Sequence, residues 1–562
     1  MLFFCKSDVA ALCSSLDVDF VLKLIFLGSF QFDLLHAFHG AKTVINLIRV
    51  AVHTSTRHRK REMDLWSSII YLLTTWIFIH YLRFFLMHSP FNPKRLPPGP
   101  LPFPIVGNIF KLGSKPHKSL AELAKAYGPV LALKLGYVST IVISSIPMAK
   151  EVLQKHDASF SNRTVVDAST VLDHHQSSVV FLSPSTKWRN MWRVCNSYVF
   201  AISQLDASRE LRRRKVQQLI SHIDHCCKVG TTMNIGQETF DTTLNILSNI
   251  FFSVDLANPR SDSGREFKEI VWDMMVVNGT PNIADFFPLL KIIDPQRIRY
   301  RAKILAQKVI TLFNTMIDER LQLRKQTGSL ESNDVLDVLL SINQENSKEL
   351  ELSVIPHLLL DLFAAGTETT SSTIEWVMTE LLRNPNELKR AQLELEEVLG
   401  KNNPMEEEDI GRLPYLQAII KETLRLHPPL PFLVPRKVIT DVEFCGYIIP
   451  KNARILVNVW AMGRDPNIWE KADLFDPKRF LGSHINFKGN DFELIPFGTG
   501  RRICPGLQLA SRMLHLIVGS LIHSFNWKLD GLVPEKIDMD EKFAFTLQKA
   551  QSLTAIPSRV YL

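Results

Sequence analysis

Residues 496–506 read PFGTGRRICPG, and this stretch decides how the rest of the chain is interpreted. Its three glycines favour a tight loop in which the backbone can approach a flat ligand closely. An apolar run with helical spacing follows from Leu507 to His523, so Cys504 is expected to lie where a helix begins. The free N–H groups and the positive dipole end of a helix N-terminus favour a thiolate. We therefore expect the Cys504 sulfur to bind a metal.

The alternative is a buried cysteine beside an ordinary glycine-rich turn, since free cysteine commonly behaves as a small buried hydrophobe. The spacing favours the metal site, because the string F-x-x-G-x-R-x-C-x-G is met by Phe497, Gly500, Arg502, Cys504 and Gly506. This loop resembles the haem-binding loop of the cytochrome P450 family. The resemblance implies that these residues bind haem b and that Cys504 is its axial thiolate. Such a ligand pushes electron density onto the iron and favours O–O cleavage.

Composition narrows the class of protein. The chain has 562 residues, enough for a large core and one or two domains. Its seven cysteines show no C-x-x-C pair and no disulfide-like spacing, which indicates a reducing compartment. The net charge of +8 is modest, and nothing in the sequence resembles a nucleic-acid motif. We expect no nucleic-acid partner, but a basic face for an acidic protein or a membrane surface.

An apolar stretch near the N-terminus predicts a membrane anchor. Residues 65–82 contain no Lys, Arg, Asp or Glu, and about 20 apolar residues suffice for a spanning helix. A short basic patch and a stiff, proline-rich segment follow, KRLPPGPLPFP at 94–104. We expect an anchor helix at 63–88, a hinge at 89–104 and a catalytic domain at 105–562; a buried core helix is the alternative for the apolar stretch.

The first 62 residues form an extension of doubtful role. The basic run RHRKR at 57–61 lies on the N-terminal side of the anchor. Positive flanks prefer the cytosol, so this run competes with Arg83, Lys94 and Arg95 over orientation. Met63 would give the anchor a clean start, and we expect residues 1–62 to be dispensable.

A run of small residues, AAGTETT at 364–370, lies inside a helix predicted over 352–382. Gly and Thr are poor interior helix residues, and such a run can serve close packing between two elements. The string also resembles the family's oxygen-activation motif, A-G-x-D/E-T, which implies that Thr369 and Glu368 form a proton relay. We expect Gly366 to thin the helix over the cofactor. Thr369 is expected to return its hydroxyl to the carbonyl four residues earlier.

Two further strings resemble family motifs. Glu422 and Arg425 share one helix face, which alone is typical of a surface ion pair. Together with FDPKRF at 475–480 they resemble the family's E-x-x-R and P-E-R-F pair. This implies that Glu422, Arg425 and Arg479 interlock and brace the haem loop. Lys478 stands where the family usually has Glu.

The resemblance also implies contacts to the haem propionates. Trp188, in a helix predicted over 187–200, and Arg436 match residues that reach these carboxylates. The family's arginine four residues after the tryptophan is replaced by Trp192, and Arg193 comes one position later. The residue that takes this role is therefore left open. Residues 157–186 predict a long irregular pocket lid, whose adjacent His174 and His175 are not expected to bind a metal.

The resemblance covers residues 63–562 and implies a mainly α cytochrome P450 fold with a smaller β part. The strings NRTVVDASTVLDHH at 162–175 and RLHPPLPFLVPRK at 425–437 look like the plant group that contains geraniol 8-hydroxylase and ferruginol synthase. The implied function is a monooxygenase that uses O2 and electrons from NADPH through cytochrome P450 reductase. The implied location is the endoplasmic reticulum membrane, with the catalytic domain in the cytosol.

Three function classes remain open: this monooxygenase, a haem-thiolate isomerase or dehydratase, and a non-enzymatic haem binder. Thr369 and Glu368 favour the first, because an isomerase needs no proton relay. The alternation of Leu430, Phe432 and Val434 predicts an apolar pocket for a small apolar substrate. A terpenoid fits this pocket, with an alkaloid or phenolic compound as the alternative.

Overall fold

The computed structural model describes residues 61–87, 96–257, 262–327, 334–401 and 403–560. It divides the chain into two units, Met1–Pro93 and Lys94–Leu562. Residues 1–60, with nearly all of the predicted extension, and 89–95, with the first part of the predicted hinge, lie outside the described residues. The rest of that hinge belongs to the larger unit, where the Ala132 amide donates to the Pro98 carbonyl at 2.9 Å.

The smaller unit contributes helix α4, Arg61–Met87, where the sequence predicts the anchor. Large apolar side chains are exposed on several sides of it, among them Ile70, Tyr71 and Phe78. Among the described residues, however, no helix combines the length and apolarity that crossing a membrane requires.

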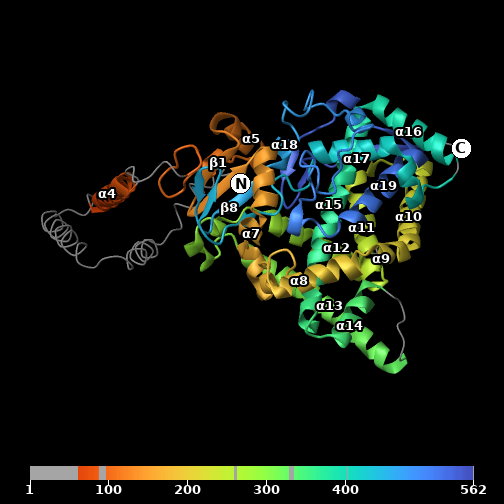
Figure 1. The fold of residues 1–562 in the computed structure, drawn as a ribbon, viewed down its shortest axis with the longest axis horizontal. Coiled ribbons are helices and arrows are strands. Elements are labelled where there is room, and N and C mark those ends of the chain that lie inside the picture. Colours follow the sequence, from red (N-terminus) through yellow and green to blue (C-terminus); the bar gives the residue numbers. More distant parts are fainter. Residues whose placement is uncertain (1–60, 88–95, 258–261, 328–333, 402, 561–562) are drawn as a thin grey trace. The chain divides into compact units, whose positions relative to one another are not determined.

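The larger unit is mainly helical, and its helices surround one long buried helix, α15 (Figure 1). Pro356 lies in the first turn of α15, where a missing N–H costs nothing, and the helix ends at Arg383, before Asn384-Pro385. The helices are α5 (Pro116–Tyr127), α6 (Ile146–Lys150), α7 (Asp157–Phe160), α8 (Thr186–Val194), α9 (Ile202–Ala207), α10 (Arg209–Val229), α11 (Ile235–Phe252), α12 (Asp262–Gly279), α13 (Ile298–Thr327), α14 (Val335–Glu345), α15 (Ile355–Arg383), α16 (Pro385–Leu399), α17 (Pro414–Leu426), α18 (Val459–Met462) and α19 (Leu507–Ser524).

The strands of the described residues form four small sheets, of which the largest lies beside α5 (Figure 1). The largest sheet has the order β1-β2-β8-β5-β3, with β2 parallel to β8 and the other neighbours antiparallel. The strands are β1 (Val130–Leu135), β2 (Val138–Ile143), β3 (Asn162–Arg163), β4 (Met233–Asn234), β5 (Arg436–Lys437), β6 (Val442–Phe444), β7 (Tyr447–Ile449), β8 (Arg454–Val457), β9 (Phe525–Lys528), β10 (Glu541–Phe543), β11 (Leu547–Lys549) and β12 (Thr554–Arg559).

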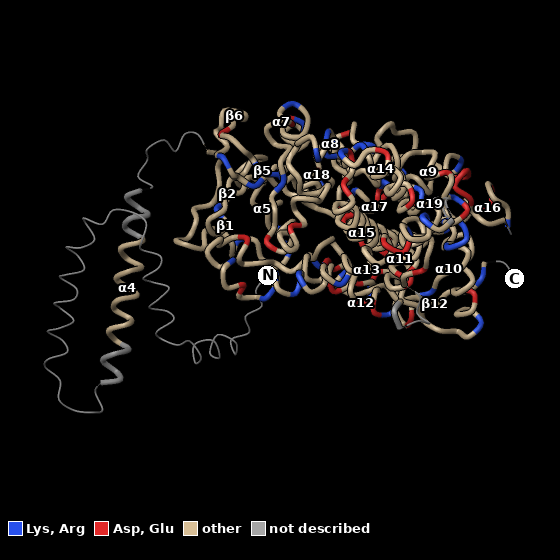
Figure 2. The backbone as a smooth tube through the Cα atoms, turned by 90° about the horizontal axis from the view of Figure 1, so that it is seen from below, with Lys and Arg blue, Asp and Glu red and all other residues tan. Residues whose placement is uncertain are grey.

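The core lies around α15, where apolar side chains of α11, α17 and α19 pack against it. Basic and acidic residues are interspersed through the larger unit (Figure 2). Most predicted elements are present, and the alternating stretch at 430–434 is followed by a short strand at Arg436–Lys437 that pairs with β8. The helix predicted over 187–200 changes to π-helical hydrogen bonding at Cys195–Val199.

Candidate active site

A largely apolar cavity of about 1480 Å³, part of it open to solvent, lies between α15, the loop before α19 and the segment that follows α17. The Cys504 loop and the AAGTETT string at 364–370 both contribute residues to this cavity. The loop supplies Phe497, Gly498 and the run from Arg502 to Gly506, and α15 supplies residues that include Ala365, Gly366 and Thr369. Leu430 and Val434 also line it, whereas Phe432 packs in a separate core cluster. The structure thus brings together motifs more than 120 residues apart in the chain.

The loop geometry explains its glycines. Gly498 and Gly500 have φ values of 72° and 69°, in the left-handed region that favours glycine. A Cβ on Gly500 would also lie 3.0 Å from the Leu153 carbonyl oxygen. The Cys504 amide donates to the Phe497 carbonyl at 2.9 Å, which closes the loop directly before α19. The predicted arrangement of loop, cysteine and helix is confirmed, and Gly500 serves the loop's shape rather than the cavity wall.

Burial and hydrogen bonding act in opposite directions on Cys504. Burial raises the pKa of its thiol to about 11, although the backbone N–H groups of Gly506 and Leu507 lower it. The backbone N–H groups at the start of the helix thus favour the thiolate, as expected, but they are outweighed. Desolvation of the charged sulfur outweighs the dipole, and a bound metal ion is what would deprotonate the thiol.

On α15, Thr369 faces the cavity and its hydroxyl donates to the Ala365 carbonyl at 2.6 Å. This bond to the residue four positions earlier confirms the prediction. Gly366 lines the same cavity, and a Cβ there would come within 2.9 Å of the Leu247 side chain on α11. Gly366 therefore permits close helix packing as well as a thin cavity wall.

Glu368 lies behind this wall. Consecutive helix residues differ by about 100° in direction, and Glu368 points toward the β10–β11 hairpin. Its Oε1 accepts a bond from the Thr546 hydroxyl at 2.9 Å and another from the Gln548 amide, while Oε2 is buried without a hydrogen-bond partner. Burial raises the pKa of Glu368 to about 7, so its protonated form is populated near neutral pH. Glu368 and Thr369 are neighbours in sequence, but only Thr369 lines the cavity.

Three arginines converge on the cavity: Arg163, Arg436 and Arg502. Burial lowers the pKa of each, and Arg436 and Arg502 lower the pKa of Arg163 further. Asp157 provides a nearby countercharge, 3.1 Å from Arg436 Nη1, and it also pairs with Arg501. The Arg163 Nε is buried without a partner. This excess of buried positive charge favours a ligand that carries carboxylates.

These residues fit haem b. The cavity offers a sulfur donor at Cys504, a small-residue surface at Ala365 and Gly366, and cationic groups for two propionates. The buried, unpaired Nε of Arg163 supports this fit, because a carboxylate would satisfy it.

Trp188 stands at the tryptophan position of the family pattern, and Trp192 stands where the family has an arginine. The Trp188 indole N–H donates to the Val179 carbonyl at 3.2 Å, and the Arg502 guanidinium lies 4.3 Å from the ring centre. Trp192 stacks on Trp188 and lines the cavity. Arg193 is directed away and pairs with Glu349 at 3.1 Å, so it does not replace the missing arginine.

Sequence reasoning missed Arg163. It stands in the sequence NRT, and no motif separates it from other surface arginines. The pairing of β3 with β5 places Arg163 opposite Arg436, and this sheet contact brings it to the cavity. A local pattern could not have indicated that contact, because Arg163 and Arg436 are 273 positions apart in the chain.

The predicted interlocking of Glu422, Arg425 and Arg479 is confirmed. Two nitrogens of Arg425 contact the two Glu422 carboxylate oxygens at 2.7 Å, and Arg479 Nε reaches Oε1 at 3.0 Å. The Asp476 amide also donates to Glu422, at 2.8 Å. Neither the Glu422 nor the Arg425 side chain is exposed. This network fixes the end of α17 to the segment that precedes the loop.

Comparison with known proteins agrees with this geometry. The family model described as Cytochrome P450 matches residues 97–554. Drimenol monooxygenase of Persicaria hydropiper is 52% identical over 84% of this chain and 94% of its own length. Geraniol 8-hydroxylase of Catharanthus roseus is 52% identical over 83% of this chain and 94% of its own.

A solved structure of a zebra fish cytochrome P450 with abiraterone matches with a TM-score of 0.67 and 25% identity. It covers 80% of this chain and all of the matched chain. The predicted fold is thus confirmed, and a haem-thiolate cofactor follows from the family. The chain belongs to the cytochrome P450 family of monooxygenases.

Proposed function

We propose that this protein is a haem-thiolate monooxygenase that hydroxylates a small apolar terpenoid. One observation carries the proposal: Cys504 and the Thr369 hydroxyl line the same apolar cavity. A sulfur donor and an oxygen-activation motif in one apolar chamber match the needs of a monooxygenase. An isomerase or a simple haem binder has no use for the oxygen-activation motif.

Each cavity residue has a proposed role in holding the cofactor. Cys504 would bind the iron, and Arg163, Arg436 and Arg502 would bind the two propionates. Phe497, Gly506 and Gly366 would offer surfaces to the flat ring, and Trp188 orients Arg502 through ring contact. Gly500 gives the loop its turn. When bound, the haem iron supplies the activation of oxygen.

Thr369 and Glu368 are proposed to supply protons. The Thr369 hydroxyl donates to the Ala365 carbonyl, which leaves its oxygen lone pairs free to accept a proton donor in the cavity. Glu368, whose pKa of about 7 suits proton exchange near neutral pH, is a reservoir behind the wall. Transfer between them requires a water or a side-chain rotation, because the two groups face different directions.

The substrate class is inferred from the lining and from the relatives. Most of the cavity's side chains are apolar, including Leu362, Leu424 and Leu509. Two relatives are named for reactions of geraniol and drimenol, both terpenoids. Another is named 7-ethoxycoumarin O-deethylase, after an aromatic ether, so alkaloids and phenolics belong among the test compounds.

Electrons are proposed to come from NADPH through cytochrome P450 reductase at the endoplasmic reticulum membrane. The exposed apolar side chains of α4, such as Leu72 and Ile77, support contact of this helix with lipid. In this arrangement the catalytic domain lies in the cytosol, where the reductase delivers electrons.

The test is turnover by the full chain together with a reductase. Microsomes that contain both proteins are given monoterpenols, diterpenes, alkaloids and phenolics, with and without NADPH. We expect an oxygenated terpenoid product that depends on NADPH and carries label from ¹⁸O₂. Product without NADPH would indicate the isomerase class, and NADPH-dependent oxidation of alkaloids alone would refute the terpenoid assignment.

A further inference from the structure

We propose that Asp361 on α15, held by His174, is a positioning residue that fixes the cavity wall at Val179 and Val180. Through this wall it decides which carbon of the substrate is oxidised. The claim about the oxidised carbon rests on the proposed function, whereas the claim about the wall does not. His174 belongs to the DHH string of the predicted lid, to which the mechanism above gives no role.

The Asp361 carboxylate is fully engaged by the lid segment. Its Oδ1 accepts the Ser178 hydroxyl at 2.9 Å and lies 3.0 Å from His174 Nε2, and its Oδ2 accepts the Val179 amide at 2.8 Å. Asp361 is only 6% exposed, yet it lines the cavity. A buried carboxylate is tolerated where hydrogen bonds satisfy it, and here all of these donors come from residues 174–179.

Val179 is also held from the other side. Its carbonyl accepts the Trp188 indole N–H at 3.2 Å and the Arg502 guanidinium at 3.3 Å. The Val180 amide donates to the Ser178 hydroxyl at 3.1 Å. The backbone at 178–180 therefore connects α15 to α8 and to the Cys504 loop, and Val179 and Val180 are the residues of this segment that line the cavity.

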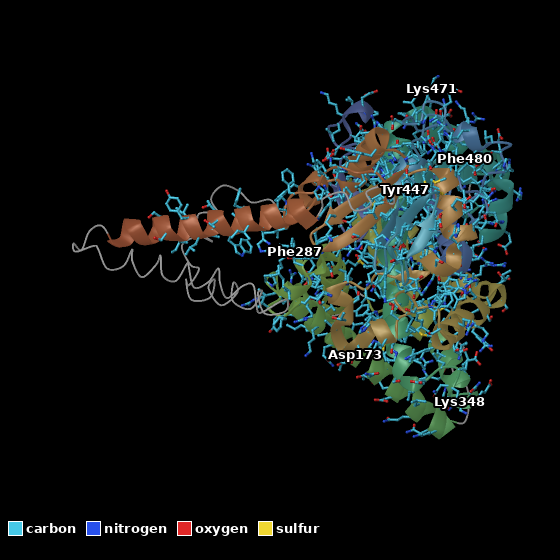
Figure 3. The ribbon with its side chains drawn as sticks, turned by 60° about the vertical axis from the view of Figure 1, so that its left-hand side comes forward. Asp173, Phe287, Lys348, Tyr447, Lys471 and Phe480 are labelled. Atoms are coloured by element: carbon cyan, nitrogen blue, oxygen red, sulfur yellow. The ribbon has the colours of Figure 1, made fainter. Side chains whose placement is uncertain are left out.

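The backbone at Leu172 and Asp173, directly before His174, is strained, and the contact between His174 and Asp361 explains why. Leu172 and Asp173 have φ values of 51° and 52°, which non-glycine residues adopt at a conformational cost. The two residues reverse the chain, so that Asp173 lies exposed at the outer edge of the domain (Figure 3) while His174 is buried. Strain of this kind persists where surrounding contacts over-determine it, and the bond of His174 to Asp361 is such a contact.

His174 uses both ring nitrogens on α15. Its Nδ1 lies 3.1 Å from Nδ1 of His357, one helical turn before Asp361. Burial and His174 lower the pKa of His357, and Lys187 and Asp173 are further charged groups that act on it. With its proton on Nε2 directed to Asp361, the His174 ring can accept the Nδ1–H of His357 at its own Nδ1. Among the described residues no such group of three side chains is arranged to hold a metal ion, so the cluster acts through hydrogen bonds.

The test combines backbone exchange with product analysis. In Asp361→Asn an NH₂ group replaces one carboxylate oxygen, so one of the N–H or O–H donors that face this oxygen loses its acceptor. His174→Ala removes the imidazole ring. His174→Gln keeps a donor near the position of Nε2 and is the rescue variant. His175→Ala removes the adjacent histidine and is the matched control, because the bonds to Asp361 come from His174, Ser178 and Val179. Haem loading is recorded for every variant.

Hydrogen–deuterium exchange of the full chain is measured for peptides that cover residues 171–182. We expect exchange there to rise about tenfold or more in Asp361→Asn and His174→Ala. His174→Gln should lie between them and the parent, and His175→Ala should match the parent. Parent-like exchange in Asp361→Asn would overturn the proposal. If that variant fails to fold, His174→Ala and Ser178→Ala decide the same question.

Products are then compared with geraniol as the probe substrate, in the presence of reductase and NADPH. We expect the ratio of oxidised positions to change severalfold in Asp361→Asn and His174→Ala and to return toward the parent ratio in His174→Gln. Raised exchange with an unchanged product ratio would refute the specificity role. Absence of product from the parent as well would count against the proposed function, and the exchange result would still decide whether Asp361 fixes the wall.

Discussion

The chemistry of single residues in this cavity is set by burial more than by local sequence. At Cys504 burial raises the thiol pKa, and at Glu368 it raises the carboxyl pKa. In both cases the charged form loses water and receives too few hydrogen bonds in return. Cys504 therefore depends on the iron to become a thiolate, whereas Glu368 retains a proton near neutral pH.

Replacement of Cys504 should remove the spectral signature of thiolate ligation. Cys504→Ser should lose the red-shifted Soret band of the reduced carbon monoxide complex. The fold should be retained, because the loop is closed by the main-chain bond to Phe497. Difference spectroscopy provides the measurement, with Cys445→Ser, at an exposed position, as the control. An unchanged band would show that another residue binds the iron.

Thr369→Ala should uncouple electron transfer from product formation. Haem and substrate binding should persist, while NADPH consumption should yield peroxide and product should fall by about a hundredfold or more, the usual range for a lost proton-transfer group. Thr367→Ala is the matched control, because that hydroxyl bonds Phe363 at 2.9 Å within the core. Thr369→Ser should restore coupling. Parent-like coupling in Thr369→Ala would refute the proton role.

Glu368 should make the protein less stable as pH rises. Its folded pKa of about 7 exceeds the usual 4.5, so the folded state keeps a proton that the unfolded state has lost. Unfolding free energy should fall between about pH 4.5 and 7, by up to about 3 kcal/mol. Glu368→Gln should lack this fall, whereas Glu443→Gln, at an exposed residue, should retain it. The free energy of unfolding is measured with denaturant at pH 5 and at pH 8. An equal change in this free energy between the two pH values in all three proteins would contradict the prediction.

Pairs of elements, not single residues, give the site its rigidity. The Glu422 network ties α17 to the segment at 472–479, which precedes the Cys504 loop in the chain. The propionate side depends on sheet pairing, since β3 and β5 place Arg163 and Arg436 side by side. The cavity wall depends on hydrogen bonds from the lid segment to α15.

Glu422→Ala should therefore damage the cofactor site from a distance. It leaves Arg425 buried without its carboxylate, and such a stranded charge costs roughly 3–5 kcal/mol. We expect little haem-loaded protein and a lower melting temperature. Absorbance per protein mass and thermal unfolding measure the two effects. Glu397→Ala, at an exposed position on α16, serves as the control, and full haem loading of the Glu422 variant would refute the brace.

On the scale of the whole molecule, the two units pose different physical problems. The larger unit buries its apolar residues around α15, whereas α4 leaves large apolar side chains exposed. Such a surface is costly in water and favours association with lipid. Orientation at a membrane then depends on basic residues within about 15–20 positions of the helix.

A chain that begins at Met63 should insert with its catalytic domain in the cytosol and keep full activity. The deletion removes eight basic and five acidic residues, among them the basic run at 57–61, and leaves the positive charge on the hinge side. Protease protection and turnover in microsomes compare the shortened and full chains. Activity or correct orientation only in the full chain would show that residues 1–62 have a function.

The sequence by itself determined the family and, through it, the fold, the cysteine loop and the Glu422 network. Each depends on short motifs whose residues have strict spacing. Short-range geometry also sufficed for the Thr369 hydroxyl, which bonds within its own helix turn. The tertiary structure decided the rest. It turned Glu368 toward the β10–β11 hairpin and directed Arg193 away. It also brought Arg163 to the cavity and joined His174 to Asp361. Burial and contacts between distant segments fix these outcomes, and no local pattern encodes them.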